Sequence, residues 1–203
     1  MADHRTVRRL LPVIGLAAML ALTACSGEAR SNASTSTEDA GSFDFDESTP
    51  LGEVIPAEAR ETAPGFGGEL LDGTEFDSES LAGDITVMNF WGSWCAPCRV
   101  ETPEFQAVYE DVKDDGVQFL GVDVKDDRQL AEAFLEGVGA EYPSLFDPRG
   151  EVALAFRGFP ANVVPTTILL DGAGQVAAVY VAVVPESELR RALDTLKAEE
   201  PPR

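Results

Sequence analysis

The sequence predicts an α/β domain over residues 62–199. Within this stretch, short apolar runs typical of strands alternate with segments whose apolar residues recur at helical spacing. Hydrophobic residues make up 44% of the chain, an ordinary content for a globular protein. Before residue 62, by contrast, Ser, Thr, Asp, Glu and Ala dominate the composition. We therefore expect one folded domain preceded by an accessory segment.

Apolar segments rich in β-branched and aromatic residues predict the strands of this domain. The predicted strands are Ile85–Trp91, Val117–Val124, Ser144–Phe146, Thr166–Leu170 and Gln175–Val183. The first is almost wholly apolar, which favours a buried strand. The last two flank Asp171–Gly174, and the two glycines in that segment predict a hairpin turn.

Apolar residues three and four positions apart predict the helices. In the segment after Cys95, one side of the predicted helix carries Phe105, Val108, Tyr109 and Val112. Further helices are predicted over Arg128–Val138 and Glu151–Phe156, and from about Glu186 onward. The alternation of these helices with the strands is the basis for the α/β prediction.

The N-terminal segment is predicted to contain a signal peptide and a tether. Residues 1–24 combine a basic start, which includes Arg8 and Arg9, with the apolar run Leu10–Leu22. A transmembrane helix is the alternative, but the run is shorter than the roughly 20 residues needed to span a bilayer. Residues 25–61 are too polar to bury a core and predict a disordered acidic tether, and residues 200–203 form a short tail.

Cys25 is a candidate lipidation site. Residues 22–25 read LTAC and resemble the bacterial lipobox, in which the signal is cut before a cysteine that becomes the lipidated first residue. The resemblance implies a protein outside the cytoplasm, anchored to the bacterial cell membrane by lipid. The alternative is a secreted protein with a spare thiol.

Charge and residue usage exclude several classes of function. The chain has 36 acidic and 15 basic residues, so its surface should repel phosphate backbones, and no nucleic-acid partner is expected. Its one histidine is His4, which leaves the domain without an imidazole for metal ligation or a Ser–His–Asp triad. Two cysteines without histidine fit a zinc site poorly, so we expect no metal and no cofactor.

Cys95 and Cys98 point to thiol chemistry. A predicted buried strand runs into a turn, and the helix is expected to open at Cys95, where unpaired backbone N–H groups lower a thiol pKa. Cysteines three apart share a helical face and can close a disulfide with little movement. A structural disulfide without turnover is the alternative, although so small a loop stabilises weakly. Trp94 either shapes the surroundings of an approaching thiol or is a plain surface aromatic.

The sequence around these cysteines resembles a known family. Residues 90–103, FWGSWCAPCRVETP, resemble the active site of TlpA/ResA-like thioredoxin-fold thiol–disulfide oxidoreductases of the lipoprotein type. Residues 164–167, VPTT, resemble the cis-proline loop that faces the cysteines in that fold. Residues 72–83 resemble the N-terminal extension of the group, and the helix over 128–138 its central insertion. The resemblance implies a thioredoxin-like fold with a central mixed β-sheet flanked by helices.

The same resemblance implies roles for individual residues. Cys95 would be the exposed attacking thiolate, and Cys98 the resolving thiol that breaks the mixed disulfide. Pro165 would follow a cis peptide bond, with the backbone of Val164 pairing to the substrate chain. A trans proline at the start of an edge strand is the alternative.

Glu101 is a candidate catalytic residue because of a departure from thioredoxins. Thioredoxins place a buried aspartate on the strand before the motif, where this chain has Asn89, which cannot take a proton. Glu101 follows Cys98 by three residues, matches the acidic residue of the TlpA/ResA-like group, and could carry the proton of Cys98. The alternative is a charge that merely complements the first turn of a helix.

The function implied is a membrane-tethered, extracytoplasmic thiol–disulfide oxidoreductase with a Cys-Ala-Pro-Cys motif. The resemblance implies that it acts as a reductant of client proteins with thiols or disulfides, in cytochrome c maturation, and takes electrons from an integral-membrane thiol carrier. A thioredoxin-fold metallochaperone is one alternative, although that type has a wider cysteine spacing and a histidine. A non-catalytic binding module is another.

Overall fold

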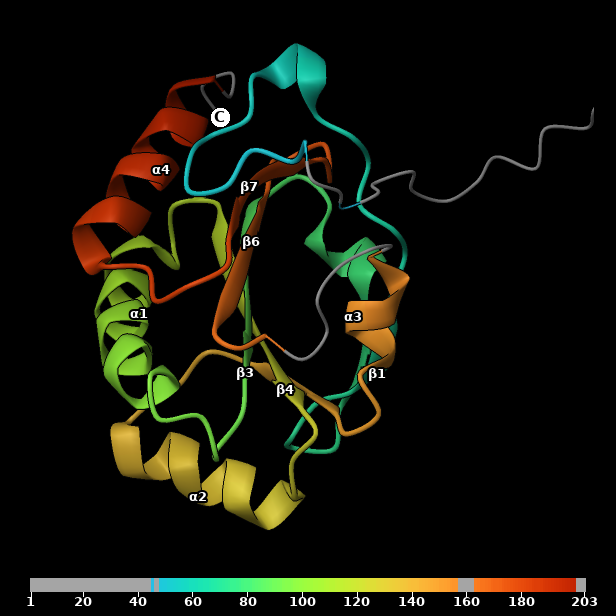
Figure 1. Ribbon diagram of the computed structural model, residues 1–203, viewed down its shortest axis with the longest axis vertical. Coiled ribbons are helices and arrows are strands. Elements are labelled where there is room, and N and C mark those ends of the chain that lie inside the picture. Colours follow the sequence, from blue (N-terminus) through green and yellow to red (C-terminus); the bar gives the residue numbers. More distant parts are fainter. Residues whose placement is uncertain (1–44, 46–47, 157–162, 200–203) are drawn as a thin grey trace, which may run out of the picture. The chain divides into compact units, whose positions relative to one another are not determined.

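The computed structural model describes residue 45, residues 48–156 and residues 163–199. A mixed five-stranded sheet with the order β5-β4-β3-β6-β7 forms its centre (Figure 1). The strands are β3 (Ile85–Trp91), β4 (Val117–Val124), β5 (Ser144–Asp147), β6 (Thr166–Leu170) and β7 (Val176–Tyr180). Strands β3, β4 and β5 run parallel, whereas β6 is antiparallel to both β3 and β7. The predicted α/β class is confirmed.

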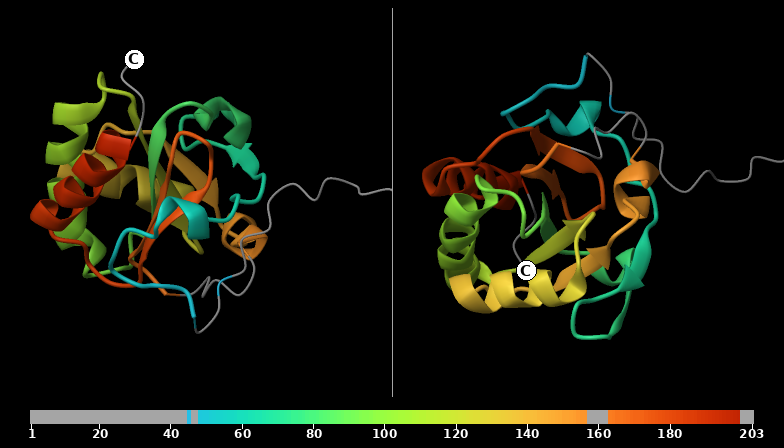
Figure 2. Two further views of the ribbon diagram at one scale, coloured as in Figure 1. Left: turned by 90° about the horizontal axis from the view of Figure 1, so that it is seen from above. Right: turned by 60° about the horizontal axis from the view of Figure 1, so that its bottom comes forward.

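Helices cover both faces of this sheet. They are α1 (Cys98–Val112), α2 (Arg128–Val138), α3 (Glu151–Ala155) and α4 (Glu186–Glu199). Helices α1 and α4 lie along one face, and α3 lies with the short strand β1 (Gly67–Glu69) on the other side (Figure 1). Helix α2 packs beside α1 near one end of the sheet (Figure 2). This layering buries the sheet from both sides.

Strand β3 is the centre of the core, and all seven of its residues are buried. Its side chains alternate between the faces, so Val87 packs under α1 and α4 while Met88 packs on the opposite side. Each face has its own apolar cluster. One contains Phe105 and Leu189, and the other contains Phe156. A mostly apolar run was the correct signal for a strand buried on both faces.

The limits of several elements match those predicted, and the differences have local causes. Strand β7 runs only from Val176 to Tyr180, shorter at both ends than predicted, and its last pair with β6 joins Tyr180 to Thr167. Helix α3 stops one residue early, since Phe156 adopts an extended backbone conformation. Strand β5 continues one residue further, to Asp147, which pairs with Val124.

The folded domain begins earlier than the predicted limit at residue 62. Val54 pairs with Ala178 of β7, Ile55 is buried, and Arg60 is held by ion pairs. Because most residues of this stretch are polar, the sequence analysis did not identify Ile55 as the buried residue that packs on the sheet. Among residue 45 and the ranges 48–156 and 163–199, no helix is long and apolar enough to cross a membrane. The predicted signal peptide, the predicted lipidation site Cys25 and the tail at 200–203 lie outside the described residues.

The N-terminal extension reaches both edges of the sheet. Residues 52–62 run along β7, and Thr62 pairs with Gln175 at its end. Further on, β1 pairs with β2 (Glu75–Asp77), and Leu70 bridges to Leu145 of β5. Exposed edge strands can pair with strands of other chains. By covering β7 and β5, this extension protects both edges of the sheet.

Candidate functional site

Cys95 and Cys98 form a disulfide with an S–S distance of 2.05 Å. They follow β3 directly, after a turn that closes where the Cys95 N–H donates to the Gly92 carbonyl at 3.0 Å. Helix α1 begins at Cys98 and not, as predicted, at Cys95. The helix begins three residues later than predicted because Cys95 is still part of the preceding turn. The Cys95 sulfur still meets the helix N-terminus, since it accepts from the Cys98 N–H at 3.2 Å.

The disulfide is more enclosed than the predicted exposed thiolate. Only 4% of Cys95 is accessible, and Cys98 is fully buried. The two cysteines lie in one apolar cluster with Trp91 and Phe134, and Val164 packs against that cluster. Cys95 is thus the more accessible of the two sulfur residues, but its exposure in the disulfide form is small, because apolar neighbours cover it.

The Val164–Pro165 peptide bond is cis, as the resemblance implied. This loop leads into β6, which pairs with β3 in the sheet, and Thr166 lies opposite Phe90. The end of β3 that carries the cysteines and the start of β6 are therefore neighbours. The Thr166 hydroxyl donates to the Val163 carbonyl at 2.7 Å and ties the loop to itself. Val164 and Pro165 are brought to the cysteines by the sheet, not by sequence proximity.

The two tryptophans of the motif have different surroundings. Trp91 is a core residue, stacked on Phe134 with ring centroids 4.9 Å apart, and its indole N–H donates to the Ser144 hydroxyl at 2.9 Å. Gly121 of β4 is required beside it, since a Cβ there would lie 2.8 Å from the indole nitrogen. Trp94, in contrast, is 53% exposed beside the disulfide. Of the two, Trp94 alone has the exposure needed to contact an approaching chain.

Glu101 is fully buried in the first turns of α1. One carboxyl oxygen accepts from the Asn89 amide at 2.9 Å, and the other accepts from the Val184 N–H at 2.7 Å. Burial raises the pKa of Glu101 to about 7, although both hydrogen bonds oppose the shift. Cys98, on the same face of this helix, is also fully buried. The side chain is therefore not a solvent-facing charge at a helix end, and it titrates near neutral pH.

Asn89 connects Glu101 to the sheet. Its amide also donates to the Thr167 hydroxyl at 3.1 Å, and the two residues face each other across β3 and β6. Behind Glu101 lies Tyr142, whose pKa is raised by its own burial and by the charge of Glu101. The carboxyl group thus belongs to a buried hydrogen-bonded group of polar residues, of which the sequence analysis singled out only Asn89 and Glu101.

Four residues of this region were given no individual role in the sequence analysis, although two of them lie within the quoted motifs. They are Arg99 and Thr167, in the motifs, and Asp123 and Asp126. Asp123 had a usable signal, because it is the one charged residue in the apolar run Val117–Val124. The others carry no local signal, since polar residues at strand ends and helix starts are ordinary.

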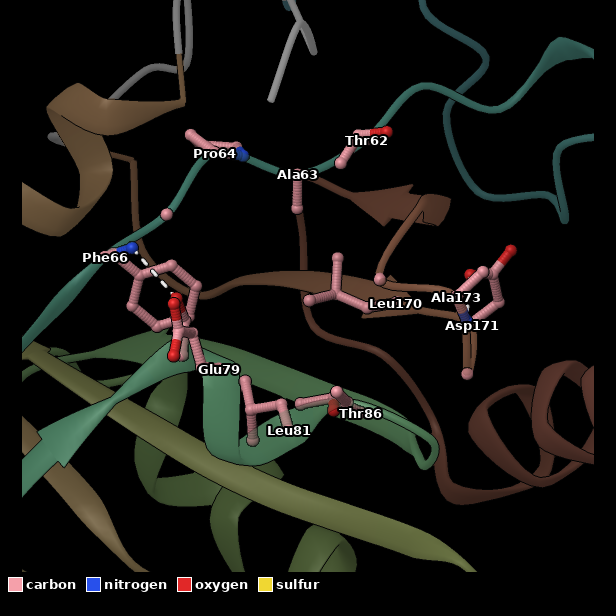
Figure 3. A pocket seen from close by; sticks show the side chains of 15 residues that line it. Thr62, Ala63, Pro64, Phe66, Glu79, Leu81, Thr86, Leu170, Asp171 and Ala173 are labelled. Carbon is pink, nitrogen blue, oxygen red and sulfur yellow. Dashed lines mark hydrogen bonds between the residues drawn. The ribbon is translucent and has the colours of Figure 1, made fainter. Parts of the chain in front are cut away.

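A separate pocket of about 330 Å³ lies at the other end of β3. Figure 3 shows Thr86 and Leu81 on one side of it and Ala63 and Leu170 across from them. Thr86 is five residues before Trp91 in a strand, which places the pocket roughly 17 Å from the cysteine end of β3. This cavity contributes nothing to the chemistry of the disulfide. In the described part of the chain, no group of three or more His, Cys, Asp or Glu could hold a metal ion.

Known proteins share this sequence and geometry. A family model described as AhpC/TSA matches residues 59–179. The thiol-disulfide oxidoreductase ResA of Geobacillus kaustophilus is 32% identical over 136 residues, which cover 67% of this chain and 76% of that protein. The residues matched by the family model include the cysteines, the cis-proline loop and most of the sheet.

Solved structures agree. A secreted thiol-disulfide isomerase from Corynebacterium glutamicum is 32% identical, with a TM-score of 0.72, and covers 77% of this chain and 99% of its own. A thiol:disulfide interchange protein of the thioredoxin family from Chlorobium tepidum is 30% identical, with a TM-score of 0.63, and covers 69% of this chain and 99% of its own. The thioredoxin-like fold implied by the sequence is confirmed.

Proposed function

The chain belongs to the AhpC/TSA family as a TlpA/ResA-like thiol–disulfide oxidoreductase, and we propose that it reduces disulfides of client proteins through Cys95 and Cys98. The observation that supports this proposal is the Cys95–Cys98 disulfide at the start of α1, with the cis-proline loop packed against it. A disulfide closed over so few residues adds little stability, which favours a bond that turns over.

The proposed reaction has two steps. The Cys95 thiolate attacks one sulfur of the client disulfide, forms a mixed disulfide and releases a client thiolate. The Cys98 thiolate then attacks the Cys95 sulfur, which closes the Cys95–Cys98 disulfide and releases the second client thiolate. Two electrons pass from the protein to the client, and the two client thiolates take up protons. Cys95 is assigned the attack because it is the more accessible cysteine.

Glu101 is proposed to accept the proton of Cys98 before the second step. Both groups are buried on one face of α1, where water cannot readily take that proton. A pKa of about 7 suits a group that must alternately bind and release a proton near neutral pH. Asn89 and the Val184 N–H would hold the carboxylate in place until it accepts this proton.

Client binding is proposed to use three residues beside the disulfide. Trp94 offers an exposed aromatic surface, and the Val164 backbone, before cis-Pro165, would pair with an extended client segment. The proposed location is outside the cytoplasm, with the mature chain anchored to the cell membrane through lipid on Cys25. A secreted relative supports action outside the cytoplasm.

The proposed pathway is cytochrome c maturation, as the resemblance of residues 90–103 implies. There, a client cysteine pair must be reduced before haem attachment. An integral-membrane thiol carrier would return Cys95 and Cys98 to the dithiol form, since each turnover leaves them oxidised.

Trapping tests the assignment of the cysteines. Cys98→Ser should accumulate mixed disulfides with clients in cells, because the resolving thiol is absent, while Cys95→Ser should form none and fail to reduce insulin with dithiothreitol. Reduction should separate the trapped mixed disulfides into the two proteins, and the clients can be identified by mass spectrometry. Alkylation of the reduced wild type should modify Cys95 first. Preferential alkylation of Cys98, or adducts on the Cys95→Ser variant alone, would reverse the roles.

A further inference from the structure

Residues outside the turn that carries Cys95 hold this turn in place. It spans residues 92–95, and Ser93 at its centre is buried. Gly92 leaves room for the Trp94 indole, whose nitrogen would lie 2.6 Å from a Cβ at that position. The indole N–H in turn points to the Val124 carbonyl at 3.4 Å, at the end of β4. The turn and the loop that follows β4 are thus in contact.

Both polar groups of the Ser93 backbone are bound by side chains from other elements. Its N–H and its hydroxyl donate to the two oxygens of Asp126, the hydroxyl at 2.9 Å. Its carbonyl accepts from the Arg99 guanidinium at 2.9 Å, and Arg99 lies over the Phe134 ring at 5.3 Å. The turn is therefore clamped between α1 and the loop after β4.

Asp126 has no need to serve as the cap of α2. The cap is Asp127, whose carboxylate accepts from the backbone of Gln129 and Leu130. Lys125, with a φ of 55°, adopts the left-handed conformation between β4 and these two aspartates. Because Asp127 caps the helix, the Asp126 carboxylate is available to Ser93, and its Oδ1 also accepts from the Asp127 N–H at 2.8 Å.

Asp123 lies behind Asp126 as a second, fully buried carboxyl group. Within the described part of the chain, neither of its oxygens has a hydrogen-bond partner. The charged groups that face it are Asp126 from the loop after β4, Asp147 from β5 and Arg128 from α2. Burial first, and then the charges of Asp126 and Asp147, raise the pKa of Asp123 to about 8, whereas Arg128 lowers it. Near neutral pH, the Asp123 carboxyl group is therefore mostly protonated.

We propose that Asp126 is a positioning residue for thiol–disulfide exchange: its carboxylate binds both donors of Ser93 and so orients the turn that presents Cys95. The inference rests on the proposed role of Cys95 as the attacking thiol. Exchange requires the attacking sulfur to align with the client S–S bond, whereas alkylation by a small reagent demands little alignment. Loss of the clamp should therefore slow exchange more than alkylation.

The test compares Asp126→Ala with Asp127→Asn, an adjacent change that removes the same charge but keeps a good helix cap and has no contact with Ser93. For each reduced full-length protein, two rate constants are measured at about pH 7, for a model peptide disulfide and for iodoacetamide at Cys95. We expect Asp126→Ala to lose on the order of 10-fold in exchange and less than about 2-fold in alkylation. Asp126→Asn, which keeps one acceptor oxygen, should fall between it and the wild type.

Asp123→Asn tests the second carboxyl. The pH dependence of the exchange rate in the wild type should include a change near pH 8 that this variant lacks, because ionised Asp123 would place a second negative charge beside Asp126.

Thermal melts of every variant distinguish a loss of positioning from a loss of folding. Equal losses of exchange and alkylation in Asp126→Ala, or rates equal to those of Asp127→Asn, would overturn the inference. A wild type that does not exchange through Cys95 would instead overturn the proposed function.

Discussion

Asn89 and Glu101 form a buried pair in which an amide donates to a carboxyl group. Because Asn89 cannot titrate, Glu101 is the member of the pair that can take up a proton. Its second hydrogen bond, from the Val184 N–H, also favours the ionised form, yet burial outweighs both bonds and raises the pKa to about 7. The carboxyl group is therefore held close to half-protonation at neutral pH.

Glu101→Gln should slow the resolving step on the order of 10- to 100-fold, since glutamine keeps the size and hydrogen bonding but cannot accept a proton. In the wild type, the rate should rise as the pH passes through about 7, where Glu101 becomes a base, and this rise should be missing in the variant. The measurement is a single-turnover pH–rate profile of thiol–disulfide exchange.

Glu110→Gln is the matched control, because Glu110 lies on the same helix but is exposed. It should reproduce the wild-type profile. Profiles of Glu101→Gln that superimpose on the wild type at equal stability would leave Glu101 without a role in proton transfer.

Residues 52–61 of the N-terminal extension form part of the folded domain, although the polar composition of this segment predicted a disordered tether. Its anchor is Arg60, whose guanidinium donates to the Ile55 carbonyl at 2.9 Å and forms ion pairs with Asp171 at 3.1 Å and Glu199 at 2.6 Å. One side chain thus joins the extension to the hairpin turn after β6 and to the end of α4. The side chain of Arg60 is only 3% exposed, so the pairs are poorly screened by water.

Arg60→Ala should lower the free energy of unfolding by about 3 kcal/mol, because it leaves Asp171 nearly buried without its cation. Urea denaturation measures the loss as a shift of the midpoint at constant slope. Arg191→Ala is the control, since Arg191 is exposed and pairs with Glu188, and it should cost less than about 1 kcal/mol. Equal midpoints for the two variants would mean that the extension does not contribute to stability through Arg60.

For the whole molecule, the two buried carboxyl groups connect stability to pH. The pKa of Glu101 rises from 4.5 to about 7 on folding, and that of Asp123 rises from 3.8 to about 8. A raised carboxyl pKa means that the native state binds more protons than the unfolded state between the two values. Stability from these groups is therefore greatest below about pH 4 and falls as the pH rises toward 8.

The double variant Glu101→Gln/Asp123→Asn should flatten this pH dependence, with about 3 kcal/mol of the change coming from Glu101 alone. Urea unfolding at about pH 5 and about pH 8.5 measures it. The net charge of −21 also destabilises the fold at high pH, so Glu132→Gln/Asp194→Asn, at two exposed sites, controls for charge removal. A slope as steep in the first double variant as in the wild type would show that neither buried carboxyl group carries the effect.

The sequence by itself determined the α/β class, the Cys95–Cys98 pair and the limits of several elements, Ile85–Trp91 and Arg128–Val138 among them. These features are encoded locally, since hydrophobic periodicity and cysteine spacing act within a few neighbouring residues. Pro165 was predicted as a candidate site residue through a family resemblance alone, and Glu101 through that resemblance together with its spacing after Cys98.

Only the tertiary structure decided which polar groups meet. Asp126 reaches Ser93 across 33 residues, and Arg60 reaches Asp171 across 111. A carboxylate on a loop has the same local sequence whether it faces water or a backbone N–H of a distant turn. Its partner depends on how strands and helices pack, and burial, which raises the pKa values of Glu101 and Asp123, exists only once that packing is complete.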